Sequence, residues 1–169
     1  MIDGDMGDAM GALLQDKVAK PDYEADFYSW AMSQAKLLRE GRLDDLDIAN
    51  LAEEIETSGR SERNALRSHY KTLALHLLKY AHQPSMKSRS WLVSIVNARA
   101  EIRRVIEDNP GLKPMRDELF AKDYADARET AAAETGLAIK TFPRQPAFSR
   151  ASAEEDGFLP PAATAIERG

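Results

Sequence analysis

Apolar side chains recur every third or fourth residue through most of this chain, and that spacing limits the fold more than any other feature. Between Ser61 and His82 the apolar positions alternate steps of four and three: Leu66, Tyr70, Leu73, Leu77 and Tyr80. Such a series forms the apolar seam of an amphipathic helix. Alternating strand patterns are absent. The sequence therefore predicts an all-α fold, a bundle of four to five mostly antiparallel helices with an extended Pro-rich C-terminal tail.

The first half of the chain contains clear signals for where helices begin and end. We expect a first helix over Asp22–Glu40, with Gly41 ending it. Asp45 or Asp47 is placed to cap a second helix that begins near Ile48. Gly59 interrupts the helical pattern, so we expect a break or a kink there.

Two more helices are predicted in the second half. Ser88 or Ser90 can cap the first of them. Its inward face is predicted to hold Trp91, Ile95, Ala98, Ile102, Val105 and Ile106. The second begins near Pro114, ends at a Gly136 cap, and turns Leu119, Phe120, Tyr124, Ala127 and Ala131 inward.

The length of 169 residues suits one domain. We expect a mobile N-terminal arm at 1–20, with a weak helical turn around Met10–Val18. A single helical domain over 21–160 and a disordered tail at 161–169 complete the predicted organisation. The chain has no cysteine, which excludes disulfides and cysteine chemistry. The first ten residues are acidic rather than basic, and no apolar run approaches the ~18 residues of a membrane span. We therefore predict a cytoplasmic protein with no membrane partner.

Several short motifs together resemble a known family. They are Tyr23-Glu-Ala-Asp-Phe-Tyr-Ser-Trp30, Leu37-Leu-Arg-Glu-Gly41, Asn50-Leu-Ala-Glu-Glu-Ile55, Gly59-Arg-Ser-Glu62, His76-Leu-Leu-Lys79, Gln83-Pro84, Ser90-Trp91, Tyr124-Ala-Asp-Ala-Arg128, Glu134-Thr-Gly136, Phe142-Pro143 and Phe158-Leu-Pro160. In this combination the chain resembles the bacterial domain-of-unknown-function family 29 over about Asp22 to Pro160. The resemblance implies a helical fold but no established activity. The chain departs from the family at Ser68-His69, where members often have Ser-Arg.

Charge is distributed unevenly between two neighbouring segments. Residues 22–58 contain ten Asp or Glu against three Lys or Arg, a net charge of −7. Residues Arg60–Arg104 contain ten Lys or Arg against two Glu, a net charge of +8. The basic segment can attract a phosphate backbone, and its candidate binding residues are Arg60, Arg63, Arg67, Lys71, His76 and Lys79. The alternative is that the acidic and basic helices pair with each other.

One spacing within the basic segment is typical of a metal-independent ribonuclease. Arg63-Asn-Ala-Leu-Arg-Ser-His69 fits the R-x(4–6)-H pattern of the HEPN ribonucleases, which are helical bundles. His69 would then act as the acid–base catalyst and Arg63 would stabilise charge on the phosphate. An arginine and a histidine at this separation are also common by chance, and the family departure falls at His69 itself.

The chain contains no motif for a metal or an organic cofactor. No histidine follows a glutamate at the spacing that di-iron bundles use, and HExxH is absent. Glu53 and Glu56 lie one turn apart and are the only candidates for a magnesium site; a solvated helix face is the alternative. Phosphate-loop, dinucleotide and serine-hydrolase motifs are also missing. We predict no cofactor.

The aromatic side chains are interpreted as core. Trp30, Trp91, Tyr23, Phe27 and Tyr80 all lie on apolar seams. With no assembled site, the leading hypothesis is a small non-catalytic interaction or regulatory module with a protein partner. The alternative is nucleic-acid binding through Arg60–Arg104, with ribonuclease activity as its most specific form.

Overall fold

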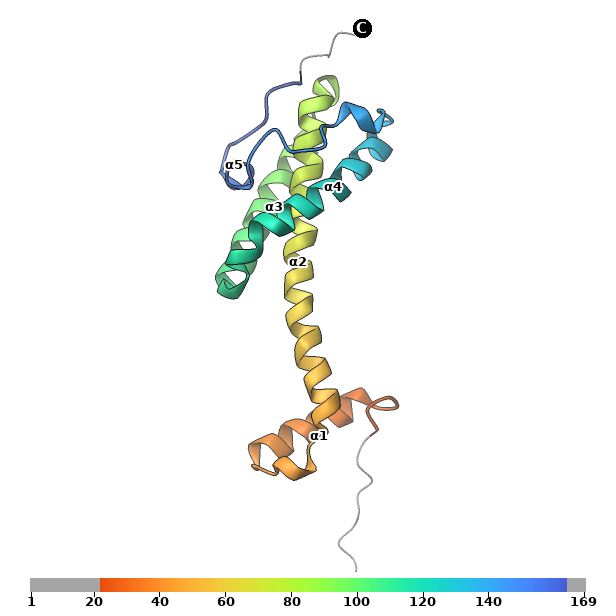
Figure 1. The fold of residues 1–169 in the computed structure, drawn as a ribbon, viewed down its shortest axis with the longest axis vertical. Helices are drawn as coiled ribbons and strands as arrows, with labels where there is room; N and C mark the ends of the chain where they lie inside the picture. Colours follow the sequence, from red (N-terminus) through yellow and green to blue (C-terminus); the bar gives the residue numbers. More distant parts are fainter. Residues whose placement is uncertain (1–21, 164–169) are drawn as a thin grey trace, which may run out of the picture. The chain divides into compact units, whose positions relative to one another are not determined.

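The computed structural model describes residues 22–163, and within that range the chain is all-α with no strand (Figure 1). The helices are α1 (Phe27–Arg39), α2 (Ile48–His82), α3 (Arg89–Asp108), α4 (Arg116–Thr135) and α5 (Arg150–Glu154). Four 3₁₀ turns connect them: η1 (Leu43–Asp45), η2 (Pro84–Met86), η3 (Pro110–Met115) and η4 (Ile139–Thr141). The predicted all-α fold is confirmed. The expected N-terminal arm at 1–20, including Met10–Val18, and residues 164–169 of the expected tail lie outside the described residues.

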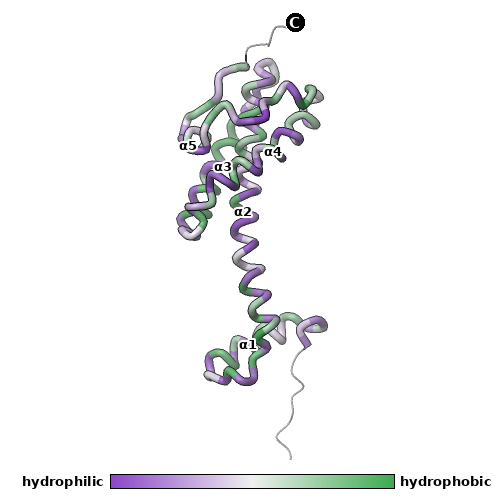
Figure 2. The backbone as a smooth tube through the Cα atoms, in the orientation of Figure 1, coloured by the Kyte–Doolittle hydropathy of each residue, from purple (hydrophilic) through white to green (hydrophobic). Residues whose placement is uncertain are grey.

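The chain divides into two compact units, Met1–Thr57 and Ser58–Gly169. We call their described parts the N-terminal unit (22–57) and the C-terminal unit (58–163). Helix α2 contributes its first ten residues to the former and the rest to the latter. Figure 2 shows hydrophobic and hydrophilic positions alternating along the helices of both units, as amphipathic helices require.

Capping side chains fix where α1 begins. The Asp26 side chain accepts a hydrogen bond from the Ser29 backbone N–H at 3.0 Å, so α1 begins at Phe27 rather than at the predicted Asp22. The helix ends before Gly41, whose φ of +70° is a left-handed conformation that favours glycine.

Asp47 joins the helices of the N-terminal unit. Its side chain accepts from the backbone N–H of Asn50, which confirms it as a cap of α2. The other oxygen accepts from the indole Nε1 of Trp30 at 3.2 Å. The backbone N–H of Asp47 in turn donates to Oε1 of the buried Gln34 at 2.8 Å. These bonds hold α1 against the start of α2.

Helix α2 runs from Ile48 to His82 without interruption, so the expected break at Gly59 is wrong. Apart from the two chain neighbours and the backbone of the adjacent helical turns, no described atom lies within 4 Å of the position that a Gly59 Cβ would occupy. A helical glycine costs only about 1 kcal/mol relative to alanine, which the rest of a 35-residue helix readily outweighs.

The core of the C-terminal unit is formed by α2, α3 and α4. The predicted inward faces of α3 and α4 are confirmed, except that Trp91 is only half-buried. Ser88 caps α3 by accepting from the Trp91 N–H, and Gly136 ends α4 at φ +70°, as predicted. Local spacing and one left-handed glycine were sufficient to predict these two helices.

The C-terminal segment (residues 137–163) returns across this core and is not wholly extended, because α5 and η4 interrupt it. Glu154 of α5 accepts hydrogen bonds from the Tyr70 hydroxyl (2.6 Å), from Arg150 (3.0 Å) and from Arg116. Arg99, almost fully buried, donates to the backbone carbonyls of Ala153 (2.8 Å) and Phe158 (2.6 Å). Side chains of three helices therefore hold the segment in place.

Candidate functional site

The basic residues of the Arg60–Arg104 segment are largely engaged by partners in the C-terminal unit. Four of them form ion pairs with carboxylates of α3, α4 or the C-terminal segment: Arg67–Asp123, Lys79–Glu134, Arg103–Asp156 and Arg104–Glu101. These carboxylates are not those of the acidic 22–58 segment. Arg67–Asp123 and Lys79–Glu134 therefore join α2 to α4, whereas Arg104–Glu101 lies within α3 and Arg103–Asp156 is exposed.

The Arg67–Asp123 pair is the most buried of these contacts. Oδ1 of Asp123 accepts from Nε (3.0 Å) and Nη2 (2.8 Å) of Arg67. The Asp123 residue is 2% exposed, and its Oδ2 is buried without a hydrogen-bond partner among the described residues. Burial raises the pKa of Asp123, and the hydrogen bonds from Arg67 offset only part of that increase.

His69 lies in a polar cleft of about 790 Å³ between α2 and α3, which Thr72, Ser94, Asn97 and Glu101 also line. Glu101 accepts from Nε of Arg104 at 3.0 Å, and this bond lowers the pKa of Glu101. The cleft therefore offers hydroxyl, amide and imidazole groups beside one ion pair.

The structure does not bring Arg63 and His69 together. At 100° per residue the two positions lie about 120° apart around α2. Arg63 does not line the cleft, and its buried Nε has no hydrogen-bond partner within residues 22–163.

His76 and Lys79 face α4 and α3 rather than an open groove. Nζ of Lys79 lies 2.6 Å from Oε2 of Glu134 and 4.7 Å from the centroid of the Trp91 ring. Burial, together with the charge of Lys79, lowers the pKa of His76. Lys79 thus acts as an internal contact that links three helices.

The remaining candidates all lie on α2. Lys71 is half-buried on α2, and Arg60 lies on an exposed part of the same helix. Glu53 and Glu56 are exposed residues one helical turn apart. No group of three His, Cys, Asp or Glu side chains within the described range could hold a metal ion.

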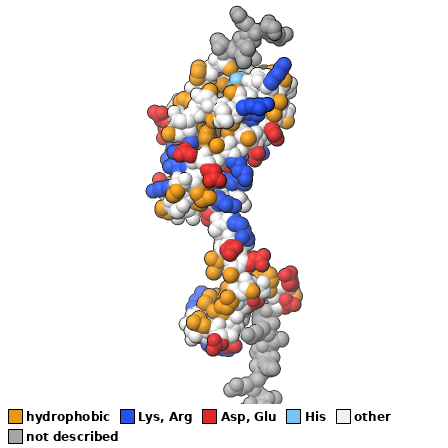
Figure 3. All heavy atoms as spheres, in the orientation of Figure 1, with side chains coloured by type: hydrophobic (Ala, Val, Ile, Leu, Met, Phe, Trp, Pro, Cys, Tyr) orange, Lys and Arg blue, Asp and Glu red, His pale blue; other side chains and the backbone are white. Residues whose placement is uncertain are grey.

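The N-terminal unit exposes many large apolar side chains, and the sequence analysis missed this feature. Phe27, predicted to be core, is 52% exposed, whereas Trp30 is buried at 3%. Seven large hydrophobic residues of this unit are exposed: Phe27, Tyr28, Met32, Leu38, Leu43, Ile48 and Ile55. We call them the exposed apolar set. Figure 3 shows hydrophobic side chains gathered on the visible face of this unit, with acidic side chains beside them.

Aromatic side chains of this unit also pack against one another around the buried Trp30. The Tyr23 ring packs edge-on against Trp30, with centroids 4.8 Å apart. Its hydroxyl donates to Oε1 of Glu54 at 2.5 Å, and that bond raises the pKa of Tyr23 to about 12. Tyr23, which precedes α1, is thus held in place by Trp30 and Glu54 but is only half-buried rather than core, and Phe27 is exposed.

The exposed set was detectable from helix geometry. The buried residues of α1 are Trp30, Gln34 and Leu37, which lie within about 60° of one another around the axis. Phe27, Tyr28 and Met32 lie outside that arc. The apolar side chains of α1 therefore occupy a wider arc than one neighbouring helix can cover. That width indicates in advance that some of them stay exposed.

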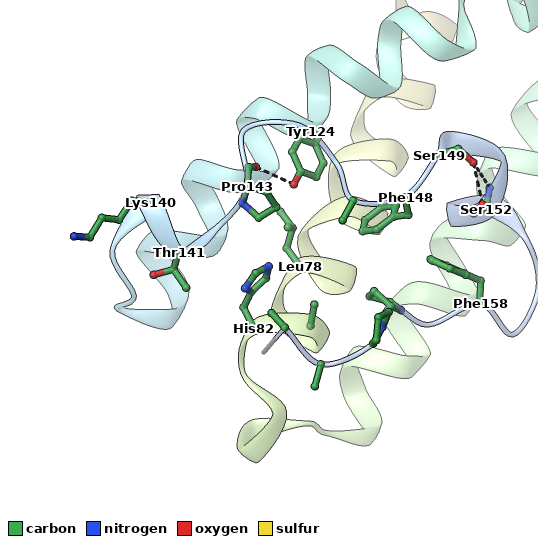
Figure 4. Close-up of a pocket in the computed structure, with 16 residues that line it drawn as sticks. Leu78, His82, Tyr124, Lys140, Thr141, Pro143, Phe148, Ser149, Ser152 and Phe158 are labelled. Carbon is green, nitrogen blue, oxygen red and sulfur yellow. Dashed lines mark hydrogen bonds between the residues drawn. The ribbon is translucent and has the colours of Figure 1, made fainter. Parts of the chain in front are cut away.

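A cavity of about 700 Å³ lies beneath the C-terminal segment (Figure 4). Helix α2 contributes Leu78 and His82, α4 contributes Tyr124, and the segment contributes Phe148 and Phe158. The Tyr124 hydroxyl donates to the Pro143 carbonyl at 3.0 Å, and burial raises the pKa of Tyr124 to about 12. Burial also lowers the pKa of His82, which favours its neutral form.

No helix in the described part of the chain is long and apolar enough to cross a membrane.

Comparison with known proteins gives one match. No curated protein and no solved structure matches the chain. The family model described as "Domain of unknown function DUF29" matches residues 23–159, which is most of the chain and includes both units. The chain therefore belongs to the DUF29 family.

Proposed function

We propose that this protein is a non-catalytic interaction module whose N-terminal unit binds a basic amphipathic helix of a partner protein. The observation that carries the proposal is the exposed apolar set. Seven of the twelve exposed large hydrophobic residues lie within 22–57, about a quarter of the described residues. Concentrations of this kind mark interaction surfaces.

The exposed area of the seven side chains, summed over α1, η1 and α2, is comparable to one side of a stable protein interface. The exposed fractions of the seven residues range from 49% for Leu38 to 74% for Tyr28. Together they equal about four whole large residues, or roughly 800 Å² at ~200 Å² each. A standard interface buries about 800 Å² on each partner.

The unit also has little core of its own. Its buried residues are Trp30, Leu37 and the polar Gln34. Small units bury a low fraction of their surface on folding and are only marginally stable by themselves. The chain has no cysteine, so burial of the exposed apolar set by a partner would stabilise the unit.

The charge of the unit selects the partner. Residues 22–57 have a net charge of −7, from ten acidic and three basic residues. A second copy of the same surface would bring −7 against −7, which is unfavourable. A basic partner gains both apolar burial and charge complementarity, and an amphipathic helix is the usual way to present both.

Nucleic-acid binding through Arg60–Arg104 has less support. Arg67, Lys79, Arg103 and Arg104 are already in ion pairs, and Arg99 is buried against backbone carbonyls. Binding phosphates with Arg67, Lys79 or Arg99 would require breaking contacts within the unit, whereas the exposed pairs of Arg103 and Arg104 are weak.

The proposal is tested by titrating the full chain with a fluorescent peptide built of Leu and Lys at helical spacing. The peptide is about 18 residues long, or five turns. Two controls have the same length: a scrambled sequence, and a version with Glu in place of Lys. We expect saturable binding of the basic helix only. Binding of labelled RNA or DNA instead, lost steeply with salt, would favour the nucleic-acid alternative.

Variants of exposed residues locate the binding surface. Met32→Ser and Ile55→Ser each remove one exposed apolar side chain, and we expect each to weaken binding about threefold to tenfold. Val96→Ser is the matched control, since Val96 is 60% exposed on α3 in the other unit. Equal affinity in Met32→Ser, Ile55→Ser and the parent would contradict the proposal.

A further inference from the structure

The cavity beneath the C-terminal segment has the features of a ligand site. We propose that it binds an unbranched apolar chain with an anionic head group, such as a medium-chain carboxylate. This site is independent of the partner surface proposed for the N-terminal unit, because every lining residue belongs to the C-terminal unit.

The size and lining of the cavity favour an apolar occupant. Its volume of about 700 Å³ is within the ~300–1,000 Å³ range of small-molecule sites. Water would need roughly 20 molecules at ~30 Å³ each to fill that volume. The walls are formed largely by Leu78, Phe148, Phe158, Pro143 and Pro160, which offer no hydrogen bonds from their side chains. Displacing such water by an apolar chain is favourable.

Several polar groups of the lining already have partners. The Tyr124 hydroxyl donates to the Pro143 carbonyl. The Ser149 and Ser152 hydroxyls lie 2.9 Å from each other, and Ser149 also accepts from the Ser152 N–H as the cap of α5. The body of a ligand therefore needs no polar groups to match these residues.

The charge of the lining selects an anion. Among residues 22–163, no Asp or Glu lines the cavity, and Lys140 is the one permanently charged residue of the lining. Lys140 makes no ion pair with any residue in 22–163. Figure 4 shows its side chain extending away from the apolar residues, beside Thr141. A carboxylate at that edge could pair with Lys140 while the chain enters the cavity.

The experiment is calorimetric titration of the full chain with decanoate. Decyltrimethylammonium, which has the same chain and a cationic head, is the matched ligand. We expect saturable binding of decanoate and affinity about threefold to fivefold weaker for the cation. Absence of saturable decanoate binding, or equal affinity for both ligands, would overturn the proposal.

Two kinds of variant test the assignment to this cavity. Ala147 is exposed at the cavity edge, so Ala147→Trp fills it from outside the core, and we expect affinity to fall at least about tenfold. Ala162→Trp also fills the cavity, from another exposed position. It replaces Ala147→Trp as the test if that variant fails to fold. Lys140→Glu should lower affinity, whereas Lys122→Glu on the exposed face of α4 should not.

One further variant separates this site from the apolar surface of the N-terminal unit. Met32→Asp should leave decanoate binding unchanged, because Met32 does not line the cavity. Loss of decanoate binding in Met32→Asp, with normal binding in Ala147→Trp, would place the ligand on the other unit and refute the proposal.

Discussion

Asp123 is the residue whose chemistry differs most from that of a surface group. One oxygen is held by Arg67, and the other is buried without a partner among the described residues. Because burial raises the pKa of Asp123 in the folded state, folding binds protons between its ordinary value of 3.8 and the raised value. The contribution of Asp123 to stability is therefore greatest at low pH and declines as pH rises through that window.

Asp123→Asn removes this titration. We expect the free energy of unfolding of the parent, measured relative to Asp123→Asn by urea unfolding, to fall as pH rises from about 4 to 7. Asp126→Asn is the matched control, since Asp126 is exposed on the same helix and only 4.0 Å from Arg67. If the free energy of unfolding of the parent relative to Asp123→Asn increased with pH, the pKa of Asp123 would be lowered by folding instead.

At the scale of elements, Gly59 and Gly136 affect the stability of their helices in opposite ways. Gly59 has helical backbone inside α2, whereas Gly136 ends α4 at φ +70°. No neighbouring atom limits a Cβ at either position. We expect Gly59→Ala to stabilise the protein by about 0.5–1 kcal/mol and Gly136→Ala to destabilise it by about 1 kcal/mol. Thermal unfolding measures both, and a stabilised Gly136→Ala would show that α4 does not end in the left-handed conformation.

The attachment of the C-terminal segment depends on Glu154. This carboxylate accepts from Tyr70, Arg116 and Arg150, and its side chain is 15% exposed. Glu154→Ala removes the shared acceptor of these three donors, although Arg150 still pairs with Asp117. We therefore expect a loss of about 2–4 kcal/mol in urea unfolding. Glu155→Ala, the exposed neighbour, should change stability by less than about 0.5 kcal/mol. Equal effects of the two variants would be inconsistent with this attachment.

At the scale of the whole molecule, the features that depend on local sequence patterns could be predicted, and those that depend on long-range contacts could not. The inward faces of α3 and α4, the Ser88 and Asp47 caps and the Gly136 end follow from spacing along one helix. The partners of Arg67 and Lys79 lie 56 and 55 residues further along the chain, and nothing in a single sequence identifies them. The cavity depends on the path of the C-terminal segment, which periodicity does not encode.

The difference between local patterns and long-range contacts also explains why Phe27 was wrongly predicted to be core. Phe27 and Trp30 lie one turn apart on α1, but only Trp30 is buried, where it donates to Asp47 at the start of α2. Sequence pattern identifies an apolar face without showing how much of it the neighbouring helix covers. The uncovered remainder is the surface to which we assign the partner.

Hydrogen–deuterium exchange of the full chain, with and without the basic Leu–Lys peptide, tests the central claim most directly. If the N-terminal unit binds the peptide, amides of residues 27–39 and 48–57 should gain protection, because binding stabilises a unit with little core. Amides of α3 and α4 should exchange at unchanged rates. Protection confined to the C-terminal unit, or no change in either unit at saturating peptide, would contradict the account.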